Sequence, residues 1–124
     1  MKSKTSHIYY HIVFCTKYRR KVITPEIELR VKELLKESED GFEIKELEVM
    51  PDHVHCFVEL ISTEKSPHQI VARLKGYSSR FLRKEFISLK TRIPSMWTRS
   101  YYIGSVGMVT KETVENYIKN QKRN

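Results

Sequence analysis

Two histidines stand one residue apart in the segment HVHCFVEL, residues 53–60. The even-numbered residues of this segment are all apolar, as in a β-strand with one face in the core. His53 and His55 then point together to the opposite face, with Cβ atoms roughly 7 Å apart. Two imidazoles at this spacing can converge on one metal ion, but they supply only two ligands. The pattern indicates either part of a metal site or two ordinary surface histidines.

The spacing alone does not identify a third ligand. The candidates are the other histidines and two nearby carboxylates: His7, His11, His68, Glu46 and Glu59. His7 and His11 flank a strand-like segment that could neighbour the histidine strand. Cys56 lies on the opposite face of that strand, so a cysteine-based zinc site is not expected.

A second group with chemical potential lies near the C-terminus. Thr113, Tyr117 and Gln121 are four residues apart and therefore share one face of an expected helix. A phenol with a pKa near 10 attacks a phosphate at neutral pH only if a cation polarises that phosphate. Tyr117 is therefore either a nucleophile served by a metal at the histidine pair, with Gln121 as an oxygen ligand, or an amphipathic tyrosine at the rim of the core.

Positive charge is in excess and is unevenly distributed. The 124 residues include 23 Lys and Arg against 15 Asp and Glu, a net charge of +8. Eight basic residues and one acid lie between Arg73 and Arg99, and a second basic cluster spans residues 17–21. Basic surfaces with interleaved rings are typical of proteins that bind nucleic-acid phosphates and stack on unpaired bases. The side chains expected to contact DNA are Lys17, Arg19, Arg20, Arg73, Lys75, Arg80, Arg83 and Lys84; the interleaved rings are Tyr18, Tyr77, Trp97, Tyr101 and Tyr102.

The composition predicts one soluble domain, residues 1–124, in the cytoplasm. Hydrophobic residues make up 40% of the chain and charged residues 31%. Apolar runs are far shorter than the roughly 20 residues that span a bilayer, and no signal peptide is visible, so we expect no membrane contact. Cys15 and Cys56 do not form a short-spaced pair, so we expect two free, buried thiols in a reducing compartment.

Periodicity and turn residues predict the elements that must position these groups. Strands are expected at residues 7–16, 42–50, 53–61 and 101–107. One helix is expected to start at Thr24-Pro25 and to end near Gly41. A second helix starts at the capping box formed by Ser66 and Gln69, and its apolar positions are Ile70, Leu74, Tyr77 and Phe81. Residues 87–95 are expected to form a loop.

The expected order of elements is β-α-β-β-α-β followed by a last helix. This order is the split βαβ, or ferredoxin-like, pattern of an α+β protein. It predicts one antiparallel sheet with two helices on one face. The pattern leaves open the place of the C-terminal helix that carries Tyr117.

Four segments, taken together, carry a resemblance to a known family. They are YHIVFCTKYR at residues 10–19, MPDHVH at residues 50–55, LKGY at residues 74–77, and the stretch from Trp97 to Gln121. In this order they resemble the single-tyrosine HUH transposases of the insertion-sequence 200/605 group, over essentially the whole chain.

The resemblance implies a role for each candidate residue. His53 and His55 match the family's His-hydrophobe-His motif, Tyr117 matches the nucleophile, and Gln121 matches the third metal ligand. Mg²⁺ or Mn²⁺ at these ligands would polarise a phosphate of single-stranded DNA, and the tyrosine would become linked to the 5′ phosphate. The implied partners are single-stranded DNA with hairpins and a second copy of the chain, with no small-molecule substrate. The tyrosine helix would serve the histidines of its own subunit or those of its partner.

Three other functions remain open at this point. A non-catalytic ferredoxin-like module could bind single-stranded nucleic acid through sheet aromatics, although the usual RNP aromatic motif is absent. A domesticated relative could process palindromes in a host genome with the same residues. A metal-dependent phosphoesterase could use water in place of tyrosine, but the second His-x-Ser/Thr motif usual in such two-histidine enzymes is also absent.

Overall fold

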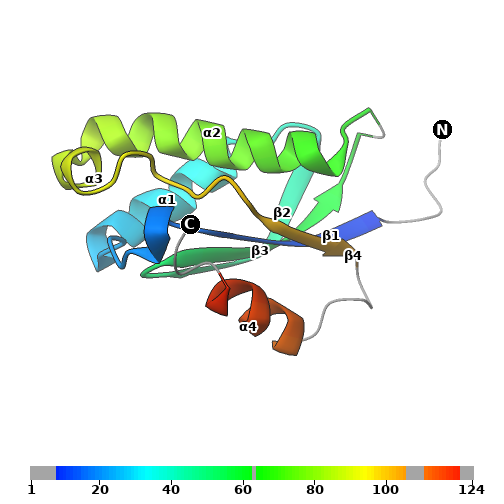
Figure 1. Ribbon diagram of the computed structural model, residues 1–124. Helices are drawn as coiled ribbons and strands as arrows, with labels where there is room; N and C mark the ends of the chain where they lie inside the picture. The colour runs from blue at the N-terminus through cyan, green and yellow to red at the C-terminus, as the bar shows by residue number, and fades with distance from the viewer. Residues whose placement is uncertain (1–7, 63, 106–110, 121–124) are drawn as a thin grey trace.

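The centre of the molecule is a four-stranded antiparallel sheet in the order β2-β3-β1-β4 (Figure 1). The computed structural model describes residues 8–62, 64–105 and 111–120. Its strands are β1 (Ile8–Cys15), β2 (Phe42–Met50), β3 (His53–Leu60) and β4 (Tyr102–Ser105). Its helices are α1 (Pro25–Glu37), α2 (Pro67–Glu85), α3 (Ile87–Arg92) and α4 (Lys111–Lys119), and a short 3-10 turn, η1, spans Lys17–Arg19. The expected α+β, ferredoxin-like fold is confirmed.

Both long helices begin at the predicted caps. The Thr24 hydroxyl accepts a hydrogen bond from the Ile27 backbone N–H, directly before the proline that starts α1. At the start of α2, Ser66 and Gln69 form the complete capping box. These bonds satisfy backbone N–H groups that have no partner within the helix. The first helix ends at Glu37 rather than near Gly41, which lies in the following turn with a positive φ of 80°.

The core lies between the sheet and the two long helices. Val54, Cys56, Val58 and Leu60 of β3 are buried there, as the alternation predicts. Of the apolar positions expected on α2, Ile70 and Leu74 are buried, whereas Tyr77 and Phe81 lie half-buried at the rim. The buried row of α2 continues through other positions: Val71, Ser78 and Leu82.

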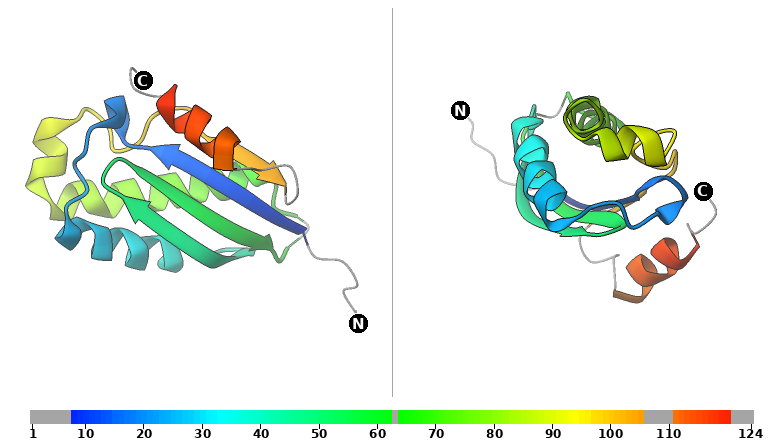
Figure 2. Two further views of the ribbon diagram at one scale, coloured as in Figure 1. Left: turned by 90° about the horizontal axis from the view of Figure 1, so that it is seen from below. Right: turned by 90° about the vertical axis from the view of Figure 1, so that its left-hand side faces the viewer.

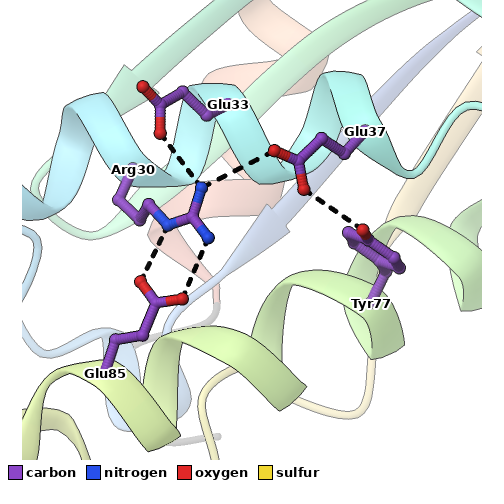
Figure 3. Close-up of polar contacts among 5 residues, drawn as sticks. All are labelled: Arg30, Glu33, Glu37, Tyr77 and Glu85. Carbon is purple, nitrogen blue, oxygen red and sulfur yellow. Dashed lines mark hydrogen bonds and ion pairs between the residues drawn. The ribbon is translucent and has the colours of Figure 1, made fainter.

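A polar cluster on the surface joins α1 to α2 (Figure 3). Arg30 of α1 binds both carboxylate oxygens of Glu85 of α2, through Nε at 2.7 Å and Nη2 at 2.9 Å. Its Nη1 also contacts Glu33 and Glu37, at 3.0 and 3.6 Å. Glu37 in turn accepts a hydrogen bond from the Tyr77 hydroxyl of α2, at 3.1 Å. Two contacts therefore tie the helices together across their exposed side.

One predicted loop contains a helix. Residues 87–92 form α3, and the prediction of a loop is wrong for these six residues. The fully buried side chain of Leu89 anchors this helix, while Ile87 stays 72% exposed. A helix of under two turns with one buried residue leaves no periodic signal in the sequence. Its fold is decided by contact with the rest of the core.

The last helix lies on the other face of the sheet. Figure 2 shows α4, in orange and red, opposite the layer of α1 and α2 and nearest to β4 and β1. Tyr117 of α4 packs against Tyr102 of β4, with ring centroids 6.1 Å apart. The sequence left the placement of α4 open. In the structure, α4 lies on the face of the sheet that carries the histidine pair. Within the described residues, no helix has the length and apolar character needed to cross a membrane.

Candidate active site

Side chains from three strands meet around the histidine pair on the α4 face of the sheet. In the strand register, His53 stands opposite Cys15 of β1, and His55 stands opposite Val13. On the other side, Met50 and Glu48 of β2 stand opposite the same two histidines. Directly opposed residues of antiparallel strands share a face. The half-buried imidazoles therefore share the face of the sheet that α4 partly covers, and His53 lies at the end of β3.

Asp52 orients the first histidine. Its Oδ1 lies 2.8 Å from Nδ1 of His53, and its Oδ2 lies 3.2 Å from Nε of Arg19. A carboxylate at Nδ1 fixes the tautomer and the ring angle and leaves Nε2 for a ligand. The sequence pattern placed Asp52 only in a turn, so spacing missed this contact with a candidate ligand. The available signal was a carboxylate directly preceding a candidate metal ligand.

A third imidazole stands beside the second histidine. His11 of β1 places Nδ1 3.2 Å from Nε2 of His55. Burial and the nearby His11 lower the pKa of His55, which keeps its ring neutral near pH 7. An open hollow of about 220 Å³ adjoins the two rings. Its lining consists of His11, Glu46, Leu47, Glu48, His55 and Phe57.

The donor set fits a divalent cation but is incomplete in the described part of the chain. Imidazole nitrogens are common metal ligands, and His53 and His55 are the two that a cation at this site would use. Among residues 8–62, 64–105 and 111–120, no group of three or more His, Cys, Asp and Glu side chains could hold a metal. Gln121 lies outside the described residues, so its role as third ligand stays a prediction.

Of the five residues considered as a third metal ligand, two lie beside the histidine pair in the described structure. His11 and Glu46 line the hollow beside His55. His68, at the start of α2, contacts the Tyr101 hydroxyl instead. Glu59 lies further along β3 and is ion-paired with Lys45, at 3.5 Å. His7 lies outside the described residues.

Tyr117 is held over the same face of the sheet. Its hydroxyl lies 3.3 Å from Oγ of Ser100, in the segment that leads to β4. Burial raises the pKa of the phenol above its usual value, against smaller opposing effects of the Ser100 and Thr98 hydroxyls. The side chain is therefore a neutral phenol at physiological pH.

Both cysteines are free and buried, as predicted. Cys56 faces the core under the helices, whereas Cys15 lies on the α4 face, close enough to influence the pKa of Tyr117. Burial raises the pKa of each thiol to about 12. Neither thiol is therefore an activated nucleophile.

The basic cluster after β1 adjoins the end of α4. Lys17 and Arg20 both lie over the ring of Tyr18, which is the exposed ring of the interleaved set, at 44%. Arg19 is bound to Asp52 and to the Ile118 carbonyl oxygen of α4. Trp97 is not available for stacking, because its ring is buried against Phe14 and its indole N–H donates to Ser78.

The candidate DNA contacts of α2 divide into two groups. Arg73, Lys75 and Arg83 donate to backbone carbonyls of neighbouring segments, and burial lowers the pKa of Lys75 to about 8. Arg80 and Lys84 are exposed, with Arg80 over the ring of Phe81. Figure 2 shows α2 on the face of the sheet opposite α4.

Comparison with known proteins decides the family. The sequence profile of the family described as "Transposase IS200 like" matches residues 4–121, nearly the whole chain. The chain belongs to this family of IS200-like transposases. Members of the family are DNA-processing enzymes that act in DNA transposition, and the protein is a transposase.

Individual relatives agree with this assignment. The chain is 32% identical to the ISDra2 transposase TnpA of Deinococcus radiodurans, over 98% of this chain and 91% of that protein. It is 35% identical to the transposase for insertion sequence element IS200 of Salmonella typhimurium, over 90% of this chain and 75% of that protein.

Solved structures support the fold. A crystal structure of a proposed transposase from Deinococcus radiodurans superposes with a TM-score of 0.90, at 30% identity, over 100% of this chain and 98% of that chain. A REP-associated tyrosine transposase bound to a REP hairpin has a TM-score of 0.56 at 12% identity, over 95% of this chain and 68% of that chain. The second likeness shows a shared fold alone.

Proposed function

We propose that this transposase cuts and rejoins single-stranded DNA through a covalent bond between Tyr117 and a 5′ phosphate. One observation carries the proposal: α4 holds Tyr117 over the same sheet face that displays His53 and His55. Chain order does not require this arrangement, since a terminal helix could pack on either face or at an edge. The nucleophile and the ligand pair of the resemblance thus come from elements that meet only in three dimensions.

Tyr117 supplies the attacking oxygen. Its phenol attacks the scissile phosphorus, so a bond from the Tyr117 oxygen to phosphorus forms and the bond to the 3′ oxygen breaks. The phenol loses its proton and the departing strand ends in a 3′-hydroxyl. Because the pKa of Tyr117 is raised by burial, the phenol is a weak nucleophile until the phosphate is polarised. The phosphodiester energy is kept in the new bond, so rejoining needs no nucleotide cofactor.

The histidine pair would hold the polarising cation. His53, oriented by Asp52, and His55, kept neutral by burial, are the imidazole ligands, and Gln121 is the proposed oxygen ligand. Mg²⁺ or Mn²⁺ bound there would act as a Lewis acid on the scissile phosphate. An oxygen ligand and phosphate oxygens beside two imidazoles suit such cations better than a thiolate would.

The proposed DNA partner is a hairpin in single-stranded DNA. The REP-associated tyrosine transposase, which shares this fold, was solved bound to a REP hairpin. The present chain has an exposed ring, Tyr18, that Lys17 and Arg20 both contact. Base stacking on a ring and phosphate contacts to cations are the interactions that unpaired DNA offers. We further propose a homodimer, on the resemblance alone.

The test is a covalent adduct with end-labelled DNA. The protein is incubated with Mg²⁺ and a single-stranded oligonucleotide from the DNA flanking its gene, with a palindrome included, and the products are separated in denaturing gel. A label at the 3′ end should migrate with the protein, and a label at the 5′ end should leave on a shorter strand with a 3′-hydroxyl. The fully paired duplex of the same sequence serves as control and should give no adduct.

Other outcomes separate the alternatives. Cleavage without an adduct would indicate attack by water, and an adduct that carries the 5′ label would reverse the proposed polarity. Light scattering on the same preparation measures the mass of the free protein. A monomeric mass with and without DNA would contradict the homodimer while leaving the chemistry intact.

A further inference from the structure

A continuous chain of contacts runs from the histidine pair to the tyrosine helix through Arg19. Nδ1 of His53 lies 2.8 Å from Oδ1 of Asp52, and Oδ2 of Asp52 lies 3.2 Å from Nε of Arg19. Nη1 of Arg19 donates to the carbonyl oxygen of Ile118, at 2.9 Å. Ile118 directly follows Tyr117 on α4. One guanidinium thus touches both the residue that orients a metal ligand and the helix that carries the nucleophile.

The backbone that delivers this guanidinium adopts an unusual conformation. Tyr18 and Arg19 have φ values of 59° and 52°, in the left-handed region that non-glycine residues rarely occupy. The turn is fixed nonetheless: the Arg19 N–H donates to the Thr16 carbonyl, and the Thr16 hydroxyl donates to the Arg20 carbonyl at 2.6 Å. Backbone strain that surrounding contacts maintain is commonly found where a side chain must be aimed. Here the aimed side chain is Arg19.

The end of α4 is suited to receive an arginine. The Ile118 carbonyl belongs to the last turn of α4, where carbonyl groups lack partners within the helix. The helix dipole adds partial negative charge at this end, so a guanidinium bound there is favourable. The helix is nine residues long, and among its described side chains only Val114 is buried. Tyr117 and Ile118 are half-buried, and a helix this short gains stability from a further polar contact.

We propose that Arg19 is a positioning residue that docks the tyrosine helix against the Asp52–His53 pair. The consequence for DNA cleavage rests on the function proposed above, whereas docking itself does not. Arg19 was expected from the sequence to contact DNA. In the docking role it acts through Tyr117 and His53 rather than through phosphate.

The chain contains its own probe of docking. Cys15 is fully buried on the face that α4 partly covers, near Tyr117 and Arg19, while Cys56 is buried in the core on the other side of the sheet. Loss of docking should expose Cys15 and leave Cys56 protected. Alkylation of the native protein with iodoacetamide, followed by mass spectrometry of each cysteine peptide, measures the two rates separately.

Two substitutions and one control make the test. Arg19→Gln removes the charge and shortens the side chain, and Arg19→Gly also relieves the positive φ, so the fold is kept in at least one variant. Arg92→Gln makes the same chemical change at an exposed site on α3. Both Arg19 variants should speed alkylation of Cys15 by roughly tenfold or more, because a charged hydrogen bond is lost. The alkylation rate of Cys56 should stay the same in these variants, and both rates should stay the same in Arg92→Gln.

Alkylation and cleavage are measured in parallel. The rate of adduct formation at saturating DNA should fall together with Cys15 protection in both Arg19 variants. Wild-type protection of Cys15 in Arg19→Gly, or equal acceleration at Cys15 and Cys56, would overturn the proposal. Weaker DNA binding with unchanged Cys15 protection would also overturn it and return Arg19 to phosphate contact. If the wild-type protein forms no adduct at all, the proposed function fails, and the alkylation result still decides the docking role.

Discussion

At the scale of single residues, the chemistry of the histidine pair depends on groups one contact further out. Asp52 holds His53 in one orientation, and His11 together with burial keeps His55 neutral. A bare His-x-His pair on a strand has no such support and is usually only a surface feature. Asp52 directly precedes His53 in the chain, whereas His11 reaches His55 only because β1 pairs with β3.

The first prediction concerns the nucleophile. Tyr117→Phe removes the attacking oxygen and keeps the ring that packs against Tyr102, so the fold and DNA binding should persist. The covalent adduct should disappear, which gel analysis with labelled DNA measures directly. Tyr102→Phe is the matched control on the same face and should retain the adduct. An adduct of wild-type yield in Tyr117→Phe would transfer the role to Tyr101 or Tyr102.

The second prediction concerns the metal ligands. His53→Ala or His55→Ala should lower the rate of adduct formation by about a hundredfold or more, because Gln121 with one imidazole cannot place a cation. Binding of Mn²⁺, measured by calorimetry in the absence of DNA, should weaken in parallel. His68→Ala serves as control, since His68 contacts Tyr101 instead of the histidine pair. Full activity of the wild-type protein in excess EDTA would show that no metal is used.

At the scale of elements, α1 and α2 are held together by different interactions on their two sides. The core side of α1 and α2 is apolar, while their exposed side is joined by Arg30, Glu85 and their neighbours (Figure 3). The bidentate geometry of this pair favours the charged carboxylate, and the bond to Arg30 lowers the pKa of Glu85. The pair should therefore stabilise the fold in a pH-dependent way.

The third prediction tests that pair. Glu85→Gln should lower the Tm by a few degrees at pH 7, because Arg30 loses its charged partner on α2. Since the pKa of Glu85 is lower in the folded state, its contribution is fully present above the ordinary glutamate value near 4.3. The contribution is lost as the pH falls through the folded-state pKa, so the two melting curves should converge in strong acid. Thermal unfolding followed by circular dichroism gives the comparison.

A matched substitution controls for charge alone. Glu28→Gln removes an equivalent carboxylate from α1, but Glu28 pairs with Lys32 within the same helix. Its effect on the Tm should be smaller than that of Glu85→Gln at pH 7. Equal effects of the two substitutions would show that the link between the helices adds nothing to a local ion pair.

At the scale of the whole molecule, the candidate DNA-contacting cations lie on two surfaces. One is the η1 turn beside the end of α4, and the other is the exposed side of α2 on the opposite face of the sheet (Figure 2). Three α2 cations, Arg73, Lys75 and Arg83, are already bound to backbone carbonyls and contribute to local structure. Arg80 and Lys84 are therefore better probes of DNA contact on this helix.

The fourth prediction concerns those two residues. Replacing Arg80 and Lys84 with Gln should weaken binding of hairpin DNA of every sequence to a similar degree. The slope of the logarithm of the DNA-binding constant against the logarithm of the salt concentration should become shallower by about 1.4 to 1.8, because two phosphate contacts are lost. The preferred cleavage site should stay the same, because phosphate contacts position the DNA rather than read its bases. Titrations at several salt concentrations provide the slopes.

The acid-rich helix supplies the control for this experiment. Lys32→Gln with Lys36→Gln removes the same charge from α1, where both lysines are paired with glutamates. Binding and slope should then change less than in the α2 variant. Identical slopes for the two double variants would mean that α2 makes no phosphate contact and that the net charge alone matters.

The sequence by itself determined the order of the strands and of α1, α2 and α4, the caps of α1 and α2, and the face on which the histidines stand. These features depend on local rules: apolar alternation in β3, a hydroxyl before the first helical turn, and apolar residues at helical spacing. The α+β class followed from that order, and the resemblance of four segments to one transposase family agreed with the family match. The roles of Tyr117 and Gln121 stay predictions from that resemblance.

Only the tertiary structure decided how the site is assembled. The placement of α4 over the histidine face, the contact of His11 with His55, and the Asp52–Arg19–Ile118 chain join residues that are distant in sequence. Packing also decided the formation of helix α3 and the burial of Trp97. Local propensity cannot specify such contacts, because their free energy comes from surfaces that exist only once the sheet has formed and its strands have taken their register.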